Sequence, residues 1–321
     1  MLKSLRAIPA LGTVSRRAFS TGKVAKGGLR IGYVPEHFST PLHFAQKYFG
    51  LNATLTPFPA GTGHMISSLK ASEIDVGIGL TEGWVAGLAK AAQAQDAAPY
   101  KLVGTYVESP LLWAISTGKD REFHDVGDLK GKKVGVSRIG SGSYVMPFVL
   151  ADQHSWLRSD GHPPFEAVPL ETFAKLRDGV NDKSADFFMW EHFTTKKYWD
   201  NGSIKRLGEV ATPWSSWKIV ARDPLDKSMQ AMSDAINAGI LYFNEHQQEA
   251  VDYISTELDY SKEDAEEWTK TVEFAKDVRG VDPKVVEKTI QTLGKAGVLD
   301  AQKVDVEDMV AIKRSSRGSS P

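Results

Sequence analysis

The sequence predicts an α/β protein with two lobes, each a mostly parallel sheet flanked by helices. Two observations carry this prediction. Short apolar runs alternate with amphipathic helical segments over residues 29–93, and the same alternation restarts at residue 128. Because strands joined through helices run parallel, each series predicts one sheet covered by helices. Between the series, closely spaced strands in residues 100–117 break the rhythm. They are expected to cross between the lobes as a hinge.

The first series begins with a buried strand, Leu29–Pro35. In the helix that follows, Thr40 suits the N-cap, Pro41 suits the first turn and Gly50 suits the C-terminal stop. The remaining segments of this series are a strand at 53–59, a helix at 61–73, a strand at 74–81 and a helix at 82–93.

The second series repeats the pattern and ends in a long helical region. Its strands are expected at 132–137, 165–170, 185–190, 204–210 and 214–223, with helices at 143–157, 172–183, 227–258, 261–275 and 283–299. We therefore predict that lobe 1 holds residues 28–115 and 219–310 and that lobe 2 holds residues 116–218. Residues 311–321 are small, polar and basic and are predicted to form a disordered tail.

The composition excludes several classes of protein. The 321 residues are 41% hydrophobic and 25% charged, which is ordinary for a globular protein. The absence of cysteine excludes disulfides and cysteine-ligated metal sites. A formal net charge of −1 leaves no basic surface for nucleic acid, and no stretch is long enough for membrane insertion.

The N-terminal residues differ from the rest in charge. No acidic residue precedes Glu36, whereas arginines and lysines recur among leucines and serines. This composition is typical of a mitochondrial transit peptide, and the run from Arg17 to Ser20 resembles a matrix-processing site. Pro9 interrupts any apolar core of a secretory signal. We expect residues 1–27 to be a transit peptide and linker, and the chain to act in the mitochondrial matrix. The alternative is a basic N-terminus without a targeting role.

A loop between a strand and a helix, "SRIGSGSYVMP", is the first candidate site. It is neither a nucleophile elbow nor a Walker A loop, because the required Gly-x-Ser-x-Gly and Gly-Lys-Ser/Thr patterns are absent. Glycines permit close backbone approach, serines donate hydrogen bonds, and the helix N-terminus favours an anionic or polar group. The candidate ligand-binding residues are Ser137, Arg138, Ser141, Gly142 and Ser143.

Further candidates follow the strands of the first series, where open α/β sheets place their ligands. Each of these side chains could instead serve as a cap or a surface residue. They are Glu36 and His37 after the first strand, Thr62 at the start of the second helix, and Thr81 and Glu82 after the third strand.

Trp190 and Glu191 end a strand of the second lobe and complete the candidate site. A tryptophan can stack on a planar ring while a neighbouring carboxylate accepts hydrogen bonds from it. If Glu36, Glu82 and Glu191 face one crevice, the ligand has donor groups as well as a polar or anionic end. An aminopyrimidine or a similar heterocycle meets this description.

Three segments resemble type 2 periplasmic-binding-like proteins. They are "LKASEIDVGIGLTEGWVAGLAKA", "DVGDLKGKKVGVSRIGSGSYVM" and "ADFFMWEHFTTK", the last with His192 where proline is usual. The resemblance covers residues 29–299. It is nearest to the branch of nitrate, sulfonate and taurine binding proteins and thiamine-pyrimidine-precursor proteins, in a fungal-type form.

The resemblance implies a binding protein that closes two lobes on a small molecule, and a thiamine-precursor-like ligand is the leading expectation. One alternative is an iron-dependent pyrimidine-synthase-like enzyme, whose cysteine-rich segment this chain lacks. The other is a ligand-regulated interaction module. A non-catalytic protein is favoured. No catalytic residue, metal ligand, cofactor or protein partner is assigned.

Overall fold

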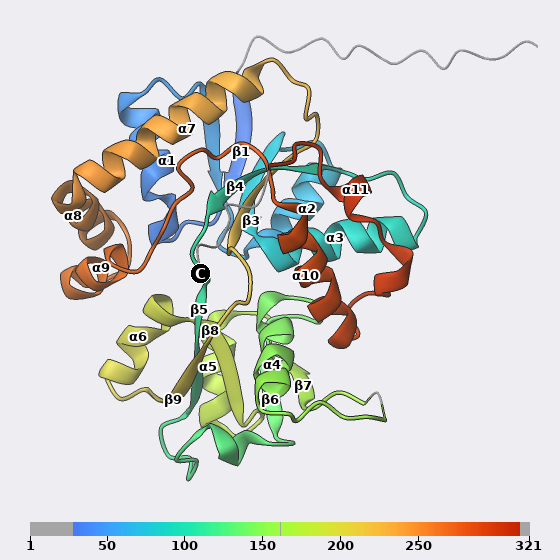
Figure 1. Ribbon diagram of the computed structural model, residues 1–321. Helices are drawn as coiled ribbons and strands as arrows, with labels where there is room; N and C mark the ends of the chain where they lie inside the picture. Colours follow the sequence, from blue (N-terminus) through green and yellow to red (C-terminus); the bar gives the residue numbers. More distant parts are fainter. Residues whose placement is uncertain (1–27, 161, 315–321) are drawn as a thin grey trace, which may run out of the picture.

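The computed structural model describes residues 28–160 and 162–314, and they form two lobes joined by two crossing segments (Figure 1). The predicted transit peptide lies outside the described residues. Lobe 1 contains a five-stranded sheet in the order β2-β1-β3-β10-β4. Its strands are β1 (Leu29–Tyr33), β2 (Ala53–Pro57), β3 (Val76–Leu80), β4 (Lys101–Val107) and β10 (Trp217–Ala221).

Lobe 2 contains a second five-stranded sheet in the order β7-β6-β8-β5-β9. In each sheet one strand is antiparallel to its neighbours: β10 in lobe 1 and β5 in lobe 2. The other four strands therefore share one direction, as the alternation predicts. The strands of lobe 2 are β5 (Leu112–Gly118), β6 (Lys133–Val136), β7 (Glu166–Pro169), β8 (Phe187–Glu191) and β9 (Ile204–Ala211).

Helices cover both faces of each sheet (Figure 1). In lobe 2 they are α4 (Gly142–Gln153), α5 (Phe173–Asn181) and α6 (His192–Asp200). In lobe 1 they are α1 (Thr40–Tyr48), α2 (Thr62–Lys70), α3 (Thr81–Gln93), α7 (Ser228–Glu245), α8 (Gln247–Glu257), α9 (Lys262–Thr269), α10 (Pro283–Lys295) and α11 (Val306–Met309). None of the helices in the described part of the chain combines the length and apolarity needed to cross a membrane.

The chain crosses between the lobes at residues 108–111 and 212–216. Ser216 ties the two crossings together, because its hydroxyl donates to the Ser109 carbonyl at 2.8 Å. β5 begins at Leu112 and pairs with the lobe 2 sheet, and β10 begins at Trp217 in lobe 1. The expected boundaries at residues 115 and 218 therefore differ from the observed ones. Apolar strand residues look the same in sequence whichever sheet they enter.

The last described residues complete the edge of the lobe 1 sheet. The Ala311 amide donates to the Leu102 carbonyl in β4, and the Val281 amide donates to the Ile312 carbonyl. Arg314 pairs with Glu108 at the first crossing. Residues 311–314 were expected in a disordered tail, but backbone pairing to an otherwise open strand edge holds them in place.

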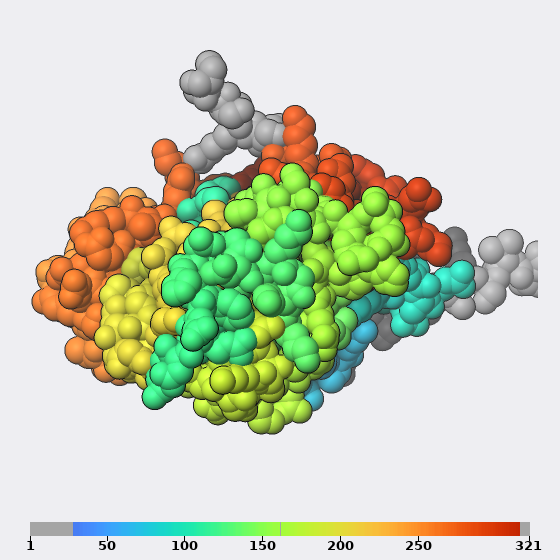
Figure 2. All heavy atoms as spheres, turned by 90° about the horizontal axis from the view of Figure 1, so that it is seen from below, coloured from blue at the N-terminus to red at the C-terminus, as the bar shows by residue number. Residues whose placement is uncertain are grey.

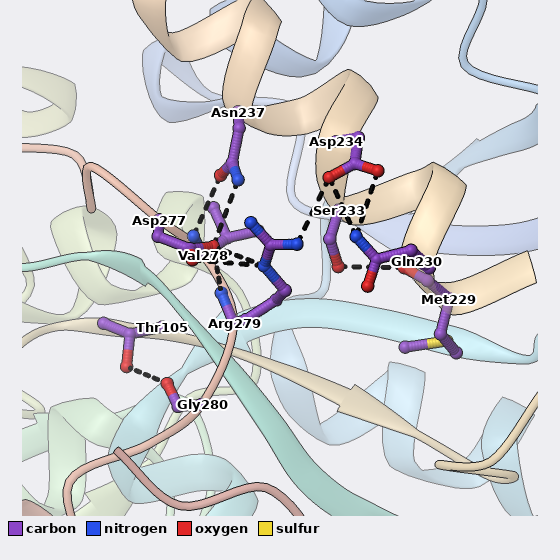
Figure 3. Close-up of polar contacts among 10 residues, drawn as sticks. All are labelled: Thr105, Met229, Gln230, Ser233, Asp234, Asn237, Asp277, Val278, Arg279 and Gly280. Atoms are coloured by element: carbon purple, nitrogen blue, oxygen red, sulfur yellow. Dashed lines mark hydrogen bonds and ion pairs between the residues drawn. The ribbon is translucent and has the colours of Figure 1, made fainter. Parts of the chain in front are cut away.

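Helix α7 fixes the neighbouring segment 277–280 against the same edge (Figure 3). The Asn237 side chain accepts from the Val278 amide at 2.9 Å and donates to Asp277 at 3.1 Å. A hollow of about 210 Å³ lies beside this segment, lined by Met229, Met232 and other residues. It lies near the end of β10, at the opposite end of the sheet from the strand ends that carry the candidate site.

Candidate functional site

The candidate residues meet where the two lobes face each other. Glu36 and His37 follow β1, Thr81 and Glu82 begin α3, and Glu191 ends β8. The two lobes contact each other here, because His37 Nε2 lies 3.7 Å from Glu191 Oε1. We call this meeting of the two lobes the cleft. The expectation that side chains after parallel strands gather at one crevice agrees with this arrangement.

His37 lies at the centre of one half of the cleft. Its side chain is 1% exposed, and its Nδ1 lies 3.0 Å from the Tyr260 hydroxyl. That hydroxyl also lies 3.1 Å from Thr194 Oγ1, which links lobe 1 to lobe 2. Burial lowers the pKa of His37 well below its usual value, so the imidazole is neutral at pH 7. The other nitrogen, Nε2, has no hydrogen-bond partner among the described residues.

Glu36 precedes His37 in the chain, Glu191 contacts it from lobe 2, and both carboxyls have shifted pKa values. Burial, followed by the charge of Glu191, raises the pKa of the Glu36 carboxyl to about 8. Burial also raises the pKa of Glu191 to about 7, although the Thr194 amide donates to its Oε2 at 2.6 Å. Both carboxyls therefore hold a proton for part of the time near pH 7.

Glu82 lies in the other half of the cleft. Its Oε2 accepts from the Trp214 indole at 3.1 Å, whereas its Oε1 is buried without a hydrogen-bond partner. Burial raises the pKa of Glu82 to about 7. Because Trp214 belongs to the second crossing segment, Glu82 couples the cleft to the connection between the lobes.

The serines of the predicted loop bond to one another. Ser141 and Ser143 are buried, with their hydroxyl oxygens 2.9 Å apart, and the Ser137 amide donates to Ser143 Oγ at 2.9 Å. A side chain on Gly142 would lie 2.9 Å from Glu82 Oε1 and 2.8 Å from the Trp113 ring. A carboxyl oxygen therefore already faces the start of α4. This position disfavours the anionic group that the loop was expected to hold, since like charges repel.

Arg138 extends from the same loop toward lobe 1. Its guanidinium lies against Gly63 near the start of α2, in the space that a side chain at Gly63 would fill. Burial lowers the pKa of Arg138. The arginine therefore closes one rim of the cleft and makes no ion pair with Glu36, Glu82 or Glu191 in the described residues.

The two candidate threonines hold the framework. Thr62 Oγ1 accepts from the Leu80 amide at 3.0 Å. Thr81 donates to the carbonyls of Ser215 and Ser216, at 2.7 and 3.0 Å. These bonds fix the end of β3 and the second crossing segment.

The structure does not bring Trp190 together with the other candidates. Its ring stacks on Phe173 of α5 with the centroids 5.1 Å apart, inside a small core of lobe 2. Trp113 of β5 lies directly opposite Glu191 in the sheet and is 4% exposed. The β-strand period of two places Trp190 and Glu191 on opposite faces, so Trp113 supplies the indole on the Glu191 face.

Sequence reasoning also missed Tyr260 and Thr194. Tyr260 lies 223 residues from His37 in the sequence, in the connection between α8 and α9, so no local pattern joins them. Trp214 and Trp217 lie just before and at the start of β10. The Nε1 atoms of Trp113 and Trp217 are both buried without an acceptor.

The rims on both sides of the cleft are in contact. Lys295 of α10 lies 2.8 Å from Asp152 of α4, and Lys196 of α6 lies 3.2 Å from Asp264 of α9. Seen from the lobe 2 end, the orange α8–α9 segment lies against the yellow α6 segment (Figure 2). A hollow of about 380 Å³ opens at this second rim, lined by Phe193, Tyr260 and charged residues.

Lys218 is the remaining charged group near the cleft. It is fully buried in β10, and its Nζ donates to the Ser215 carbonyl at 3.1 Å and to the Ser215 hydroxyl at 2.5 Å. Burial lowers the pKa of Lys218 to about 7. Within residues 28–160 and 162–314, no group of three His, Cys, Asp or Glu side chains is placed to hold a metal ion.

Comparisons with known proteins agree with this architecture. Residues 113–210 match the family described as Ca3427-like PBP. The solved structure of the Candida albicans CA3427 gene product, described as defining a new family with the generic periplasmic binding protein fold, is 46% identical. The match covers 85% of this chain and 91% of that one, with a TM-score of 0.76.

Two more distant solved structures share the fold. The alkanesulfonate-binding protein SsuA from Xanthomonas axonopodis pv. citri, bound to MOPS, is 18% identical with a TM-score of 0.69. That match covers 88% of this chain and 96% of that one. SsuA from Escherichia coli is 15% identical with a TM-score of 0.66, covering 92% and 96%. No curated protein matches the chain.

Proposed function

Because the chain belongs to the Ca3427-like family of proteins with the periplasmic-binding-protein fold, we propose that it binds a small molecule in the cleft between its lobes. This fold closes two lobes around a ligand by bending at the crossing segments. The chain retains each part that this motion needs: two separate sheets, two adjacent crossings and polar residues where the lobes meet.

One observation carries the proposal. Four buried polar atoms at the meeting of the lobes have no hydrogen-bond partner among the described residues: His37 Nε2, Glu82 Oε1, Trp113 Nε1 and Trp217 Nε1. An unpaired buried donor or acceptor costs about 1–3 kcal/mol. A ligand that pairs them would recover this free energy, and the atoms come from both lobes.

The same four atoms indicate which hydrogen-bonding groups the ligand must carry. The two indole N–H groups require acceptors, and Glu82 Oε1 requires a donor when it is ionised. Aromatic side chains around the cleft favour a planar ring. We therefore propose a heterocycle with both ring acceptors and an exocyclic amine, such as an aminopyrimidine resembling a thiamine precursor. We further propose that the protein acts in the mitochondrial matrix, on the basis of its N-terminal composition.

An anion such as a sulfonate is a poorer ligand for this cleft, although the SsuA neighbours are named as sulfonate-binding proteins. Glu36, Glu82 and Glu191 would repel it, and Arg138 lies at the rim. The iron-dependent enzyme gains no support either, because the described residues offer no three-ligand cluster for a metal. No contact favours the interaction-module alternative.

Isothermal titration calorimetry with 4-amino-2-methylpyrimidine tests the proposal. We expect one site per chain. Trp113→Phe should weaken binding about fivefold, because it removes one indole hydrogen bond of about 1 kcal/mol while keeping an aromatic ring. Trp156→Phe is the matched control and should bind like wild type, since the Trp156 ring packs on His154 and Phe165 beyond the C-terminal end of α4. Unchanged affinity of Trp113→Phe, or no binding by wild type, would contradict the proposal.

A further inference from the structure

Among the described residues, three carboxyls face the cleft without a lysine or arginine partner. Glu36 reaches it from the end of β1, Glu82 from the start of α3 and Glu191 from the end of β8. None of the three makes an ion pair with a lysine or arginine in the described part of the chain. The only basic side chain that approaches one of them there is His37, whose Nε2 lies 3.7 Å from Glu191 Oε1.

The two nearby basic side chains, Lys218 and Arg138, contact other groups than these carboxyls. The Lys218 ammonium donates to both oxygens of Ser215, and the Arg138 guanidinium lies over Gly63 at the rim. Neither lies between the carboxyls.

His37 does not supply the missing positive charge. Its imidazole is enclosed by the rings of Trp268, Tyr260 and Phe38, with centroids 4.3 to 4.5 Å away. Such an apolar enclosure disfavours the imidazolium. Tyr260 and Thr194 are the other polar groups facing His37, and both are neutral at pH 7, since burial raises the pKa of Tyr260 well above its usual value.

We propose that the cleft binds its ligand as an organic cation, such as a protonated ring nitrogen, an amidinium or an ammonium group, with the positive charge facing Glu36 and Glu191 beside His37. This inference rests on the proposed function and narrows the class of ligand. A ligand cation would offset the repulsion between the carboxyls, which is strong where water is excluded.

Two alternatives fit the contacts less well. A metal ion would need several ligands converging on one point, and the described residues provide no such group. A cationic side chain of a protein partner would have to pass the rims, where the Lys295–Asp152 and Lys196–Asp264 pairs join the lobes. A small organic cation can be enclosed when the lobes close.

The test compares two probes of nearly the same shape, the cation benzamidine and the neutral benzamide, by calorimetry at pH 7. We expect wild type to bind benzamidine at least tenfold more tightly than benzamide. Glu191→Gln and Glu36→Gln should each reduce this preference to about threefold or less. Glu266→Gln, an exposed carboxyl on α9, is the control and should keep the full preference.

A second readout distinguishes charge recognition from shape. A cation favours ionised carboxyls, so benzamidine binding should release protons, measured as a heat that changes with the ionisation enthalpy of the buffer. Benzamide should release none.

Equal affinity for the two probes, with Trp113→Phe weakening both, would overturn the cation inference and leave the proposed binding site intact. If neither probe binds, and 4-amino-2-methylpyrimidine binds with an affinity that does not fall as the pH rises above the pKa of its ring nitrogen, the cation inference is also overturned. If none of the three binds, the proposed function itself fails.

Discussion

Replacing Glu36 with glutamine should change how the stability of the protein depends on pH. The pKa of Glu36 is raised to about 8 in the folded protein, whereas an unfolded chain titrates near the ordinary value of 4.5. Between these values the folded state binds a proton that the unfolded state has lost. The free energy of unfolding therefore falls as pH rises from 4.5 through 8, and below 4.5 the carboxyl makes no difference.

The size of this change in the free energy of unfolding follows from the shift in the pKa of Glu36. At 1.36 kcal/mol per pKa unit, a rise from 4.5 to about 8 corresponds to about 5 kcal/mol at pH 9. This figure is an upper value, because opening of the lobes would hydrate Glu36 and relieve part of the cost. Near pH 5, the folded protein holds a neutral side chain of similar shape in both forms, so wild type and Glu36→Gln should differ in stability by less than about 1 kcal/mol.

Urea unfolding followed by circular dichroism at pH 5, 7 and 9 measures the difference. We expect Glu36→Gln to become more stable than wild type as pH rises, by at least about 1 kcal/mol at pH 9. Glu266→Gln should follow wild type at every pH, since that carboxyl is exposed. If wild type and Glu36→Gln lose stability in parallel from pH 5 to 9, Glu36 is not a buried, proton-holding group and the reasoning is refuted.

Three further predictions concern other parts of the structure. Gly142→Ala should keep the lobes apart, because its methyl group would lie 2.9 Å from Glu82 Oε1 of lobe 1. Small-angle scattering should show a larger radius of gyration, and an unchanged value would contradict the closed contact. Trp190→Ala should lower the free energy of unfolding by about 3 kcal/mol in urea titrations, because its ring packs against Phe173 and Trp113. A free energy of unfolding equal to that of wild type would show that neither contact stabilises lobe 2. Asn237→Ala should lower the free energy of unfolding by about 1–3 kcal/mol, because it leaves the buried Val278 amide without an acceptor. If the variant is as stable as wild type, water replaces the side chain as the acceptor.

Local sequence patterns predict the alternating elements and the edge of the sheet where the candidate side chains lie. The strand ending at Glu191 and the helix beginning at Glu82 could be placed because apolar runs and turn residues lie next to each other in the chain. The two-lobed architecture follows from the same alternation and agrees with the solved relatives.

What sequence could not supply was the pairing of distant segments. Trp190 was expected beside Glu191 in the cleft, but neighbouring residues of a strand take opposite faces, and Trp113, which pairs with Glu191 across the sheet, was not among the candidates. Tyr260 reaches His37 only because α9 packs against the segment after β1, where the Trp268 ring contacts His37 and Phe38. The serines of the loop looked like ligand donors, but their bonds to one another depend on a loop conformation that composition does not encode.

The position of β10 has a consequence for the order in which the chain folds during synthesis. Lobe 2 is one uninterrupted stretch of residues 112–211, so all of its strands emerge before β10 is made. The lobe 1 sheet cannot form until β10 enters between β3 and β4, and its edge is completed by residues as late as Lys313. We expect lobe 2 of the nascent chain to fold while β1 to β4 still have unpaired edges. Unpaired strand edges make this intermediate prone to aggregation. Limited proteolysis of a chain truncated after residue 216 should then leave lobe 2 as the resistant fragment, and uniform digestion would show that lobe 2 needs lobe 1 to fold.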